Sequence, residues 1–176
     1  MTLETNTWIL DATAFIRMDF SQLQATPNVL FFTTQSVGSE LKDFRSRMNL
    51  DSLRYSGRLK FSNPQDKIIQ ELKKQIQKVD PQTTLSSTDI EVLALAIQLK
   101  GTLISNDLNL QNAAYHFKIP IKVLSGKKIV SPRKWQLKCQ GCGKLSNDTF
   151  QICPNCGGSL KRVQIKPVNL DSELME

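Results

Sequence analysis

The 176-residue sequence lacks several features that would assign it to common protein classes. No apolar run approaches the roughly 18 residues of a membrane-spanning helix. The N-terminus, Met1-Thr2-Leu3-Glu4, has neither the basic start nor the apolar core of a signal peptide, so we expect a cytoplasmic protein. Neither a G-x-x-x-x-G-K-[ST] loop nor a G-x-G-x-x-G turn is present, which removes support for nucleotide hydrolysis and dinucleotide binding.

Histidine and cysteine are scarce. His116 is the only histidine, and the sequence offers no Ser-His-Asp or Cys-His arrangement for nucleophilic catalysis. The only four cysteines all lie in the last quarter of the chain, which in a cytosolic protein indicates metal binding rather than disulfides. They form two C-x-x-C-G units, Cys139-Gln-Gly-Cys142-Gly and Cys153-Pro-Asn-Cys156-Gly.

Each C-x-x-C unit points two thiolates at one site, and the two units together predict tetrahedral coordination by four sulfur atoms. This closed coordination is typical of structural zinc, although a rubredoxin-like iron site has the same ligands. A closed site leaves no open position, so this metal is not expected to be catalytic. The metal replaces the hydrophobic core that so short a module lacks.

Basic residues outnumber acidic ones, and the excess is local. The formal net charge is +7, and residues 126–166 hold nine Lys and Arg against Asp148 alone. A solvated face explains many charge runs, but the density here favours a surface that binds nucleic-acid phosphates. We predict that RNA binds Arg133, Lys134, Trp135, Lys138 and Lys144. Trp135 and Phe150 are candidates both for base stacking and for packing within the module.

The rest of the chain alternates short apolar runs with amphipathic segments. We expect strands at residues 7–10, 29–33, 102–105 and 119–124. We expect helices at 13–20, 34–48, 64–79, 86–100 and 108–117, with Thr13, Ser36, Asn63 and Ser86 or Ser87 as the first four N-caps. Residues 49–63 are interpreted as a hairpin or flexible arm. Short strands alternating with helices predict an α/β fold whose parallel sheet is covered on both faces.

Four acidic residues fall where this fold places one edge of the sheet. Asp11 ends the first strand, Glu40 lies in the expected helix at 34–48, Asp89 opens the helix at 86–100, and Asp107 follows the strand at 102–105. Each has an ordinary explanation as a cap or a solvated side chain. Grouped carboxylates repel one another, however, and a hard divalent cation such as Mg²⁺ or Mn²⁺ removes that repulsion. Such an ion activates water and stabilises charge on a phosphate.

These motifs resemble a PIN-domain nuclease over residues 7 to about 124. The residues that carry the resemblance are Ile9-Leu10-Asp11-Ala-Thr-Ala-Phe15, Val37-Gly-Ser-Glu40-Leu41, Ser86-Ser-Thr-Asp89-Ile-Glu-Val-Leu-Ala-Leu-Ala96 and Leu103-Ile-Ser-Asn-Asp107. With a C-terminal zinc ribbon preceded by Arg133-Lys134-Trp135, the chain is similar to the short archaeal form of the NIN-one-binding family. That family consists of metal-dependent endoribonucleases that mature the 3′ end of small-subunit ribosomal RNA.

We expect a three-layer α/β/α domain at residues 1–126, which the resemblance implies is PIN-like. A basic linker at 127–134, a zinc ribbon at 135–166 and an acidic, disordered tail at 167–176 are expected to follow. The resemblance implies that Asp11, Glu40, Asp89 and Asp107 are catalytic ligands of Mg²⁺ or Mn²⁺, with Thr13 and Ser105 as nearby hydroxyls, and that structural Zn²⁺ is held by Cys139, Cys142, Cys153 and Cys156. Family members often carry a second acid beside the last Asp, and Asn106 occupies that place here.

The implied partner is pre-rRNA in the precursor of the small ribosomal subunit, with ribosome-assembly factors as further partners. Two other functions stay open. One is a non-catalytic RNA-binding assembly factor built on a degenerate nuclease fold, which the full set of four acids disfavours. The other is a toxin-type PIN ribonuclease acting on tRNA or mRNA, which the basic cysteine-containing segment disfavours.

Overall fold

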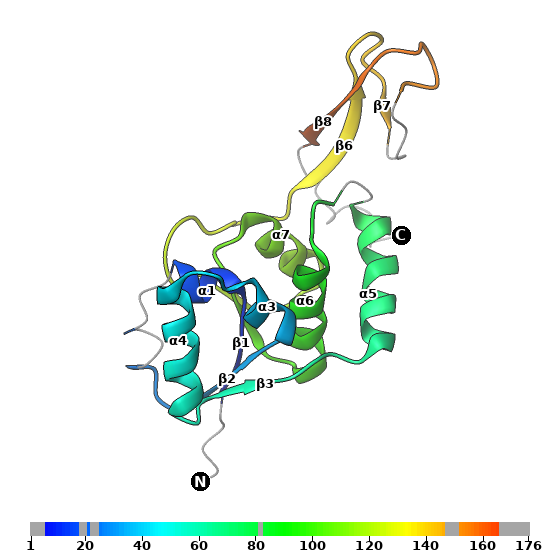
Figure 1. Ribbon diagram of the computed structural model, residues 1–176. Coiled ribbons are helices and arrows are strands. Elements are labelled where there is room, and N and C mark those ends of the chain that lie inside the picture. Colours follow the sequence, from blue (N-terminus) through cyan, green and yellow to red (C-terminus); the bar gives the residue numbers. More distant parts are fainter. Residues whose placement is uncertain (1–5, 18–20, 22–24, 81–82, 147–151, 166–176) are drawn as a thin grey trace.

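The computed structural model in Figure 1 describes residues 6–17, 21, 25–80, 83–146 and 152–165. Its strands are β1 Asn6–Leu10, β2 Val29–Thr33, β3 Leu59–Phe61, β4 Thr102–Ile104, β5 Ile121–Lys122, β6 Lys134–Cys139, β7 Leu145–Ser146 and β8 Leu160–Ile165. Its helices are α1 Ala12–Ile16, α3 Gln35–Glu40, α4 Phe44–Tyr55, α5 Asp66–Val79, α6 Ser87–Leu99 and α7 Leu108–His116.

The predicted parallel sheet is confirmed. Strands β1 to β5 form a five-stranded sheet in the order β3-β2-β1-β4-β5, and every neighbouring pair is parallel. Successive residues of a strand point to opposite faces. Ile9 and Leu10 of β1 are both fully buried, and so are Leu103 and Ile104 of β4. Both faces of the central strands are therefore covered, as a three-layer α/β/α arrangement requires.

The second sheet belongs to the cysteine module, the name used here for residues 135–166. Strands β6, β7 and β8 pair antiparallel in the order β7-β6-β8. Figure 1 shows that this sheet extends away from the α/β domain on the side of α7. Of the helices that the structure describes, none combines the length and apolar character needed to cross a bilayer.

The prediction of one helix over residues 34–48 is wrong. Helix α3 ends at Glu40 because Leu41 is extended (φ −75°, ψ 99°), and Asp43 then begins α4 by accepting a 2.9 Å hydrogen bond from the N–H of Ser46. Helix α4 continues to Tyr55, so residues 49–63 are not a hairpin or an arm. The sequence hid this helix because its inward residues are only Ser46, Leu50 and Leu53 among many polar ones.

Three of the four expected N-caps also differ. Asp11 caps α1 in place of Thr13, and Thr34 caps α3 in place of Ser36. Helix α5 begins after Gln65, which makes no side-chain capping bond, rather than after Asn63. Ser86 does cap α6, in a reciprocal capping box with Asp89.

Gly101, which follows α6, lies against the start of β1. A Cβ atom built on it would stand 2.9 Å from the carbonyl oxygen of Thr7 and 2.2 Å from Cδ1 of Ile9. We expect Gly101→Ala to lower the free energy of unfolding by about 1–3 kcal/mol, because backbone must move to relieve the overlap. Thermal denaturation measures this effect, and an unchanged melting temperature would show that the strand yields without cost.

Candidate active site and metal centre

Asp11 lies where β1 ends beside β4. Its N–H donates to the carbonyl oxygen of Ile104 at 3.2 Å, and its side chain is only 4% exposed. Oδ1 accepts from the N–H of Ala12 at 2.6 Å, and Oδ2 accepts from the hydroxyls of Thr13 and Ser105, each at 2.8 Å. Burial raises the pKa of Asp11 despite these hydrogen bonds, which act to lower it.

The two hydroxyls join the ends of β1 and β4 into one network. Thr13 Oγ1 donates to Asp11 and accepts from the N–H of Asn106 at 3.0 Å. Ser105 Oγ likewise donates to Asp11 and accepts from the N–H of Asp107 at 3.0 Å. The structure thus places Thr13 and Ser105 beside Asp11, and the network fixes the carboxylate in one orientation.

Asp89 and Asp107 reach the same edge of the sheet from two helix starts. Asp89 accepts from the N–H and the hydroxyl of Ser86 at 2.7 and 2.9 Å, and Asp107 caps α7 by accepting from the N–H groups of Asn109 and Leu110, both at 2.8 Å. The pKa of Asp89 is raised chiefly by burial and further by the charges of Asp11 and Asp107. Asp11, Asp89 and Asp107 form the set called the acid edge below.

Glu40 is less closely tied to this set. It is the last residue of α3 and is exposed, and no hydrogen bond among the described residues joins it to the acid edge. Glu91, which lies two residues after Asp89, accepts a hydrogen bond from the hydroxyl of Ser36. The structure therefore brings three of the four predicted acids together and leaves Glu40 at the end of a neighbouring helix.

The donor chemistry of the acid edge fits a hard divalent cation. Carboxylate oxygens are the ligands that Mg²⁺ and Mn²⁺ prefer. A bound cation relieves the repulsion from Asp11 and Asp107, which adds to burial in raising the pKa of Asp89. Within the described part of the chain, only cysteines place three or more ligand atoms within 4.8 Å of one another. The three carboxylates of the acid edge therefore do not converge as closely as the four sulfur atoms do.

The affinity of this site for Mn²⁺ should depend on pH. Asp11 and Asp89 both have raised pKa values, and a proton on either carboxyl group competes with the ion. We therefore expect Mn²⁺ affinity to weaken as the pH falls from neutrality through the raised pKa values of these acids. Calorimetric titration at a series of pH values measures this, and an affinity independent of pH would contradict the assignment of these ligands.

The four cysteines converge as predicted. The Sγ atoms of Cys139 and Cys156 are 3.4 Å apart, those of Cys142 and Cys153 are 3.7 Å apart, and all four lie within 4.8 Å of one another. Sulfur atoms bound tetrahedrally at Zn–S distances of about 2.3 Å are separated by about 3.8 Å. The site therefore has the dimensions of a tetrahedral four-sulfur metal centre.

The backbone around the cysteines supports metal binding. Gly143 and Gly157 have φ values of +72° and +71°, the left-handed conformation that lets each C-x-x-C turn close. The N–H groups of Cys142 and Gly141 donate to Sγ of Cys139 and lower the pKa of this thiol to about 6. A lowered thiol pKa favours the thiolate, which is the form that binds metal.

The cysteine module is held against α7 and the end of α5. Asn112 accepts from the N–H of Arg133 at 2.6 Å and donates to its carbonyl oxygen at 3.0 Å. Arg162 forms a 3.0 Å ion pair with Asp80, and its guanidinium lies 4.5 Å from the ring centroid of Trp135. Trp135 thus packs against Arg162, and its contact with RNA stays a prediction.

The other basic residues predicted to bind RNA are distributed along the module. Lys138 and Lys144 are exposed, and Arg133 is half-buried where the linker meets β6. The side chain of Lys134 and all of Phe150 lie outside the described residues. Sequence reasoning missed the buried amides Gln111 and Asn112, whose only signal is that polar side chains interrupt the apolar face of α7.

Known proteins resemble this chain in sequence. The family model described as the PIN domain of ribonuclease matches residues 8–99. Endoribonuclease Nob1 of Pyrococcus abyssi is 37% identical over 136 residues, which cover 75% of this chain and 83% of that protein. The chain belongs to the Nob1 family of PIN-domain endoribonucleases.

Other Nob1 proteins match as well. Endoribonuclease Nob1 of Methanothermobacter thermautotrophicus is 30% identical over 160 residues, covering 88% of this chain and 91% of that protein. The 20S-pre-rRNA D-site endonuclease NOB1 of Saccharomyces cerevisiae is 31% identical over 103 residues, covering 58% of this chain and 22% of the yeast protein.

Comparison with solved structures supports the fold. VapBC2 from Rickettsia felis, bound to a DNA fragment from its promoter, superimposes with a TM-score of 0.51 at 15% identity, over 68% of this chain and 99% of that one. The PIN fold and endoribonuclease activity therefore follow from family membership. The acid edge lies at the carboxyl ends of the strands, which is where α/β folds bind ligands.

Proposed function

We propose that this Nob1-family endoribonuclease cleaves the precursor of small-subunit ribosomal RNA at its 3′ end, in the cytoplasm, during ribosome maturation. The observation that carries the proposal is the convergence of Asp11, Asp89 and Asp107 on one edge of the sheet, where burial raises the pKa of Asp89 and the charges of Asp11 and Asp107 raise it further. The name of the yeast relative, a 20S-pre-rRNA D-site endonuclease, supports the choice of substrate.

In this proposal Asp11, Asp89 and Asp107, together with Glu40, hold Mg²⁺ or Mn²⁺. The bound ion would supply a metal-activated water and neutralise charge on the scissile phosphate. Thr13 and Ser105 orient Asp11 through their 2.8 Å hydrogen bonds, so that the ligand is fixed before the ion arrives. The bonds from Ser105 to Asp11 and from the N–H of Asn106 to Thr13 tie the end of β1 to the residues that follow β4.

In the same proposal, the cysteine module binds the RNA substrate. Cys139, Cys142, Cys153 and Cys156 would hold Zn²⁺, which is commoner than iron in closed four-cysteine sites of this kind and stabilises the short antiparallel sheet. Arg133, Lys134, Trp135, Lys138 and Lys144 are the proposed RNA-binding residues. Proteins that assemble the small subunit are proposed as further partners.

Competition between RNAs tests the substrate. The full-length protein with Mn²⁺ is mixed with equal amounts of a fragment spanning the 3′ end of precursor small-subunit rRNA, a tRNA and an unrelated mRNA fragment. We expect the precursor fragment to be cleaved first, and chelation of Mn²⁺ to stop the reaction. Faster cleavage of tRNA or mRNA would favour a toxin-type ribonuclease. Failure to bind Mn²⁺ outside the cysteine site, with no cleavage, would favour a non-catalytic assembly factor.

A further inference from the structure

A cavity of about 610 Å³ adjoins the acid edge. This volume falls within the range of about 300–1,000 Å³ that is usual for ligand pockets. Three segments line it: the end of α1, the turn from β4 into α7, and the linker that leads to β6. The lining residues that matter for its chemistry are Thr13, Arg17, Asp107, Lys127 and Arg133.

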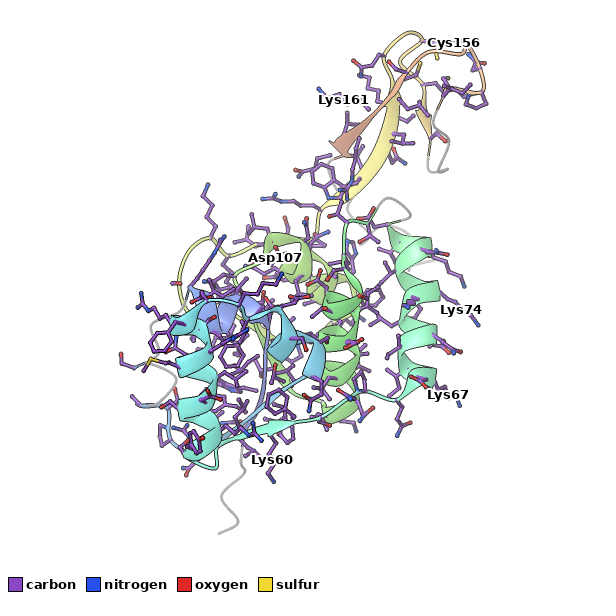
Figure 2. All side chains as sticks on the ribbon, in the orientation of Figure 1. Lys60, Lys67, Lys74, Asp107, Cys156 and Lys161 are labelled. Carbon is purple, nitrogen blue, oxygen red and sulfur yellow. The ribbon has the colours of Figure 1, made fainter. Side chains whose placement is uncertain are left out.

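The cavity and the acid edge share residues. Asp107 belongs to both, and Thr13 lines the cavity while donating its hydrogen bond to Asp11. Figure 2 places Asp107 on the side of the α/β domain from which the cysteine module extends, with Cys156 near the far end of that module. A strand of RNA that passes the acid edge toward the module therefore meets this cavity.

The charge of the cavity suits phosphate. Arg17, Lys127 and Arg133 supply three positive charges against the single carboxylate of Asp107. Within the described ranges, the only ion pair joins Arg162 to Asp80, so none of these three cations is neutralised by a bonded acid there. Arg17 and Lys127 are exposed, which leaves their charged groups accessible to a ligand.

The linker presents Lys127 and Arg133, the two of its basic residues that line the cavity, from a fixed backbone. Gln111, which is fully buried, donates to the carbonyl oxygen of Lys127 at 3.2 Å and accepts from the N–H of Ile129 at 2.9 Å. Asn112 holds both backbone polar groups of Arg133. Because these bonds fix the backbone in advance, a ligand pays less ordering entropy on binding.

We propose that this cavity is a phosphate subsite that holds the RNA backbone beside the scissile phosphate, with Arg17 and Lys127 as the residues that contact a non-reacting phosphate. The inference rests on the proposed function and extends it, because neither residue belongs to the predicted ligand or RNA-binding sets. Arg133, which lies both on the cavity and at the start of the module, makes the subsite continuous with the proposed RNA-binding residues.

The test combines charge removal in the protein with charge removal in the RNA. Full-length Arg17→Gln, Lys127→Gln and the control Lys128→Gln are compared, since Lys128 is an exposed cation next to Lys127 that does not line the cavity. The probe is a short single-stranded RNA with the precursor 3′-end sequence, carrying one neutral methylphosphonate linkage at each position in turn. Binding is measured with Ca²⁺ and cleavage with Mn²⁺, at several salt concentrations.

We expect Arg17→Gln and Lys127→Gln each to weaken RNA binding about threefold to tenfold, and to reduce the salt slope by about 0.7, while Mn²⁺ affinity stays within twofold of the wild type. When the methylphosphonate stands at one particular position next to the scissile phosphate, the wild type and the variant should bind the RNA equally well. The reason is that the neutral linkage and the substitution remove the same contact.

Two results would overturn the subsite. One is that, at every linkage, the loss of RNA affinity caused by the variant simply multiplies with the loss caused by the neutral linkage. The other is that Lys128→Gln loses as much RNA affinity as Arg17→Gln and Lys127→Gln. If the wild type binds the RNA but never cleaves it, the proposed function fails while the binding data still decide the subsite.

Discussion

Replacing Asp11 by Asn should lower RNA cleavage by about a thousandfold or more while raising the melting temperature of the metal-free protein. Cleavage is lost because an amide is a poor ligand for Mg²⁺ or Mn²⁺ and cannot balance the charge of the ion. RNA binding should be retained, since the proposed phosphate contacts come from other residues. A single-turnover assay and a filter-binding assay on the same RNA separate the two effects.

The stability gain follows from the sign of the pKa shift. The folded-state pKa of Asp11 is raised, so its stabilising contribution is present below the unfolded pKa of about 3.8 and is lost as the pH rises through the folded value. At neutral pH a buried charge therefore destabilises the metal-free fold. Asn keeps an acceptor for the N–H of Ala12, and its amide group can donate to the hydroxyls of Thr13 and Ser105. We expect a gain of about 1–2 kcal/mol.

Added Mn²⁺ should make the wild type more stable than Asp11→Asn. An ion at one hundred times its dissociation constant stabilises the protein that binds it by about 2.7 kcal/mol, and only the wild type should gain this. Asp43→Asn is the matched control, because Asp43 is an exposed cap of α4 with a lowered pKa. That variant should lose stability and keep full cleavage. An Asp11→Asn protein that cleaves at the wild-type rate would remove Asp11 from the catalytic set.

Loss of the cysteine-bound metal should unfold the module and leave the α/β domain intact. In Cys153→Ser a buried sulfur ligand is replaced, and the short sheet β7-β6-β8 has little apolar core to hold it without the metal. We expect RNA affinity to fall about tenfold or more, because the cations of the module are no longer held on one surface. Near-ultraviolet circular dichroism of Trp135 and RNA titration report these losses.

The α/β domain provides the internal reference for that experiment. Mn²⁺ binding at the acid edge should stay within twofold of the wild type, since all three acids lie on the five-stranded sheet and its helices. Ser159→Ala is the control for the substitution itself, because Ser159 is exposed and outside the four-sulfur site. Unchanged RNA affinity in Cys153→Ser would show that the cysteine module does not contribute to RNA binding.

The sequence was a good guide where periodicity and ligand spacing are local. The strands β1, β2 and β4 and the helices α6 and α7 lie where their apolar runs and caps predict. The two C-x-x-C units predict the convergence of four sulfur atoms because only one tight turn separates the thiols of each unit. Asp11 and Asp107 could be placed on one edge because parallel strands end on the same side of a sheet. Asp89 could be placed there because it opens a helix whose amino end faces that edge.

The sequence failed where tertiary contacts decide. Nothing local separates α3 from α4, because the break at Leu41 is one extended residue followed by the cap Asp43. The buried amides Gln111 and Asn112 act on the linker through bonds that span 16 to 21 residues. Arg17 and Lys127 are far apart in the sequence but line the same cavity, which only the assembled fold reveals.

The decisive measurement is to map the cleavage of a precursor rRNA fragment to the nucleotide, with wild-type and Asp11→Asn protein side by side in Mn²⁺. We expect a single cut at the mature 3′ end of the small-subunit RNA, which disappears in Asp11→Asn and on chelation of Mn²⁺. Cleavage at scattered sites, or the same cut from both proteins, would contradict it.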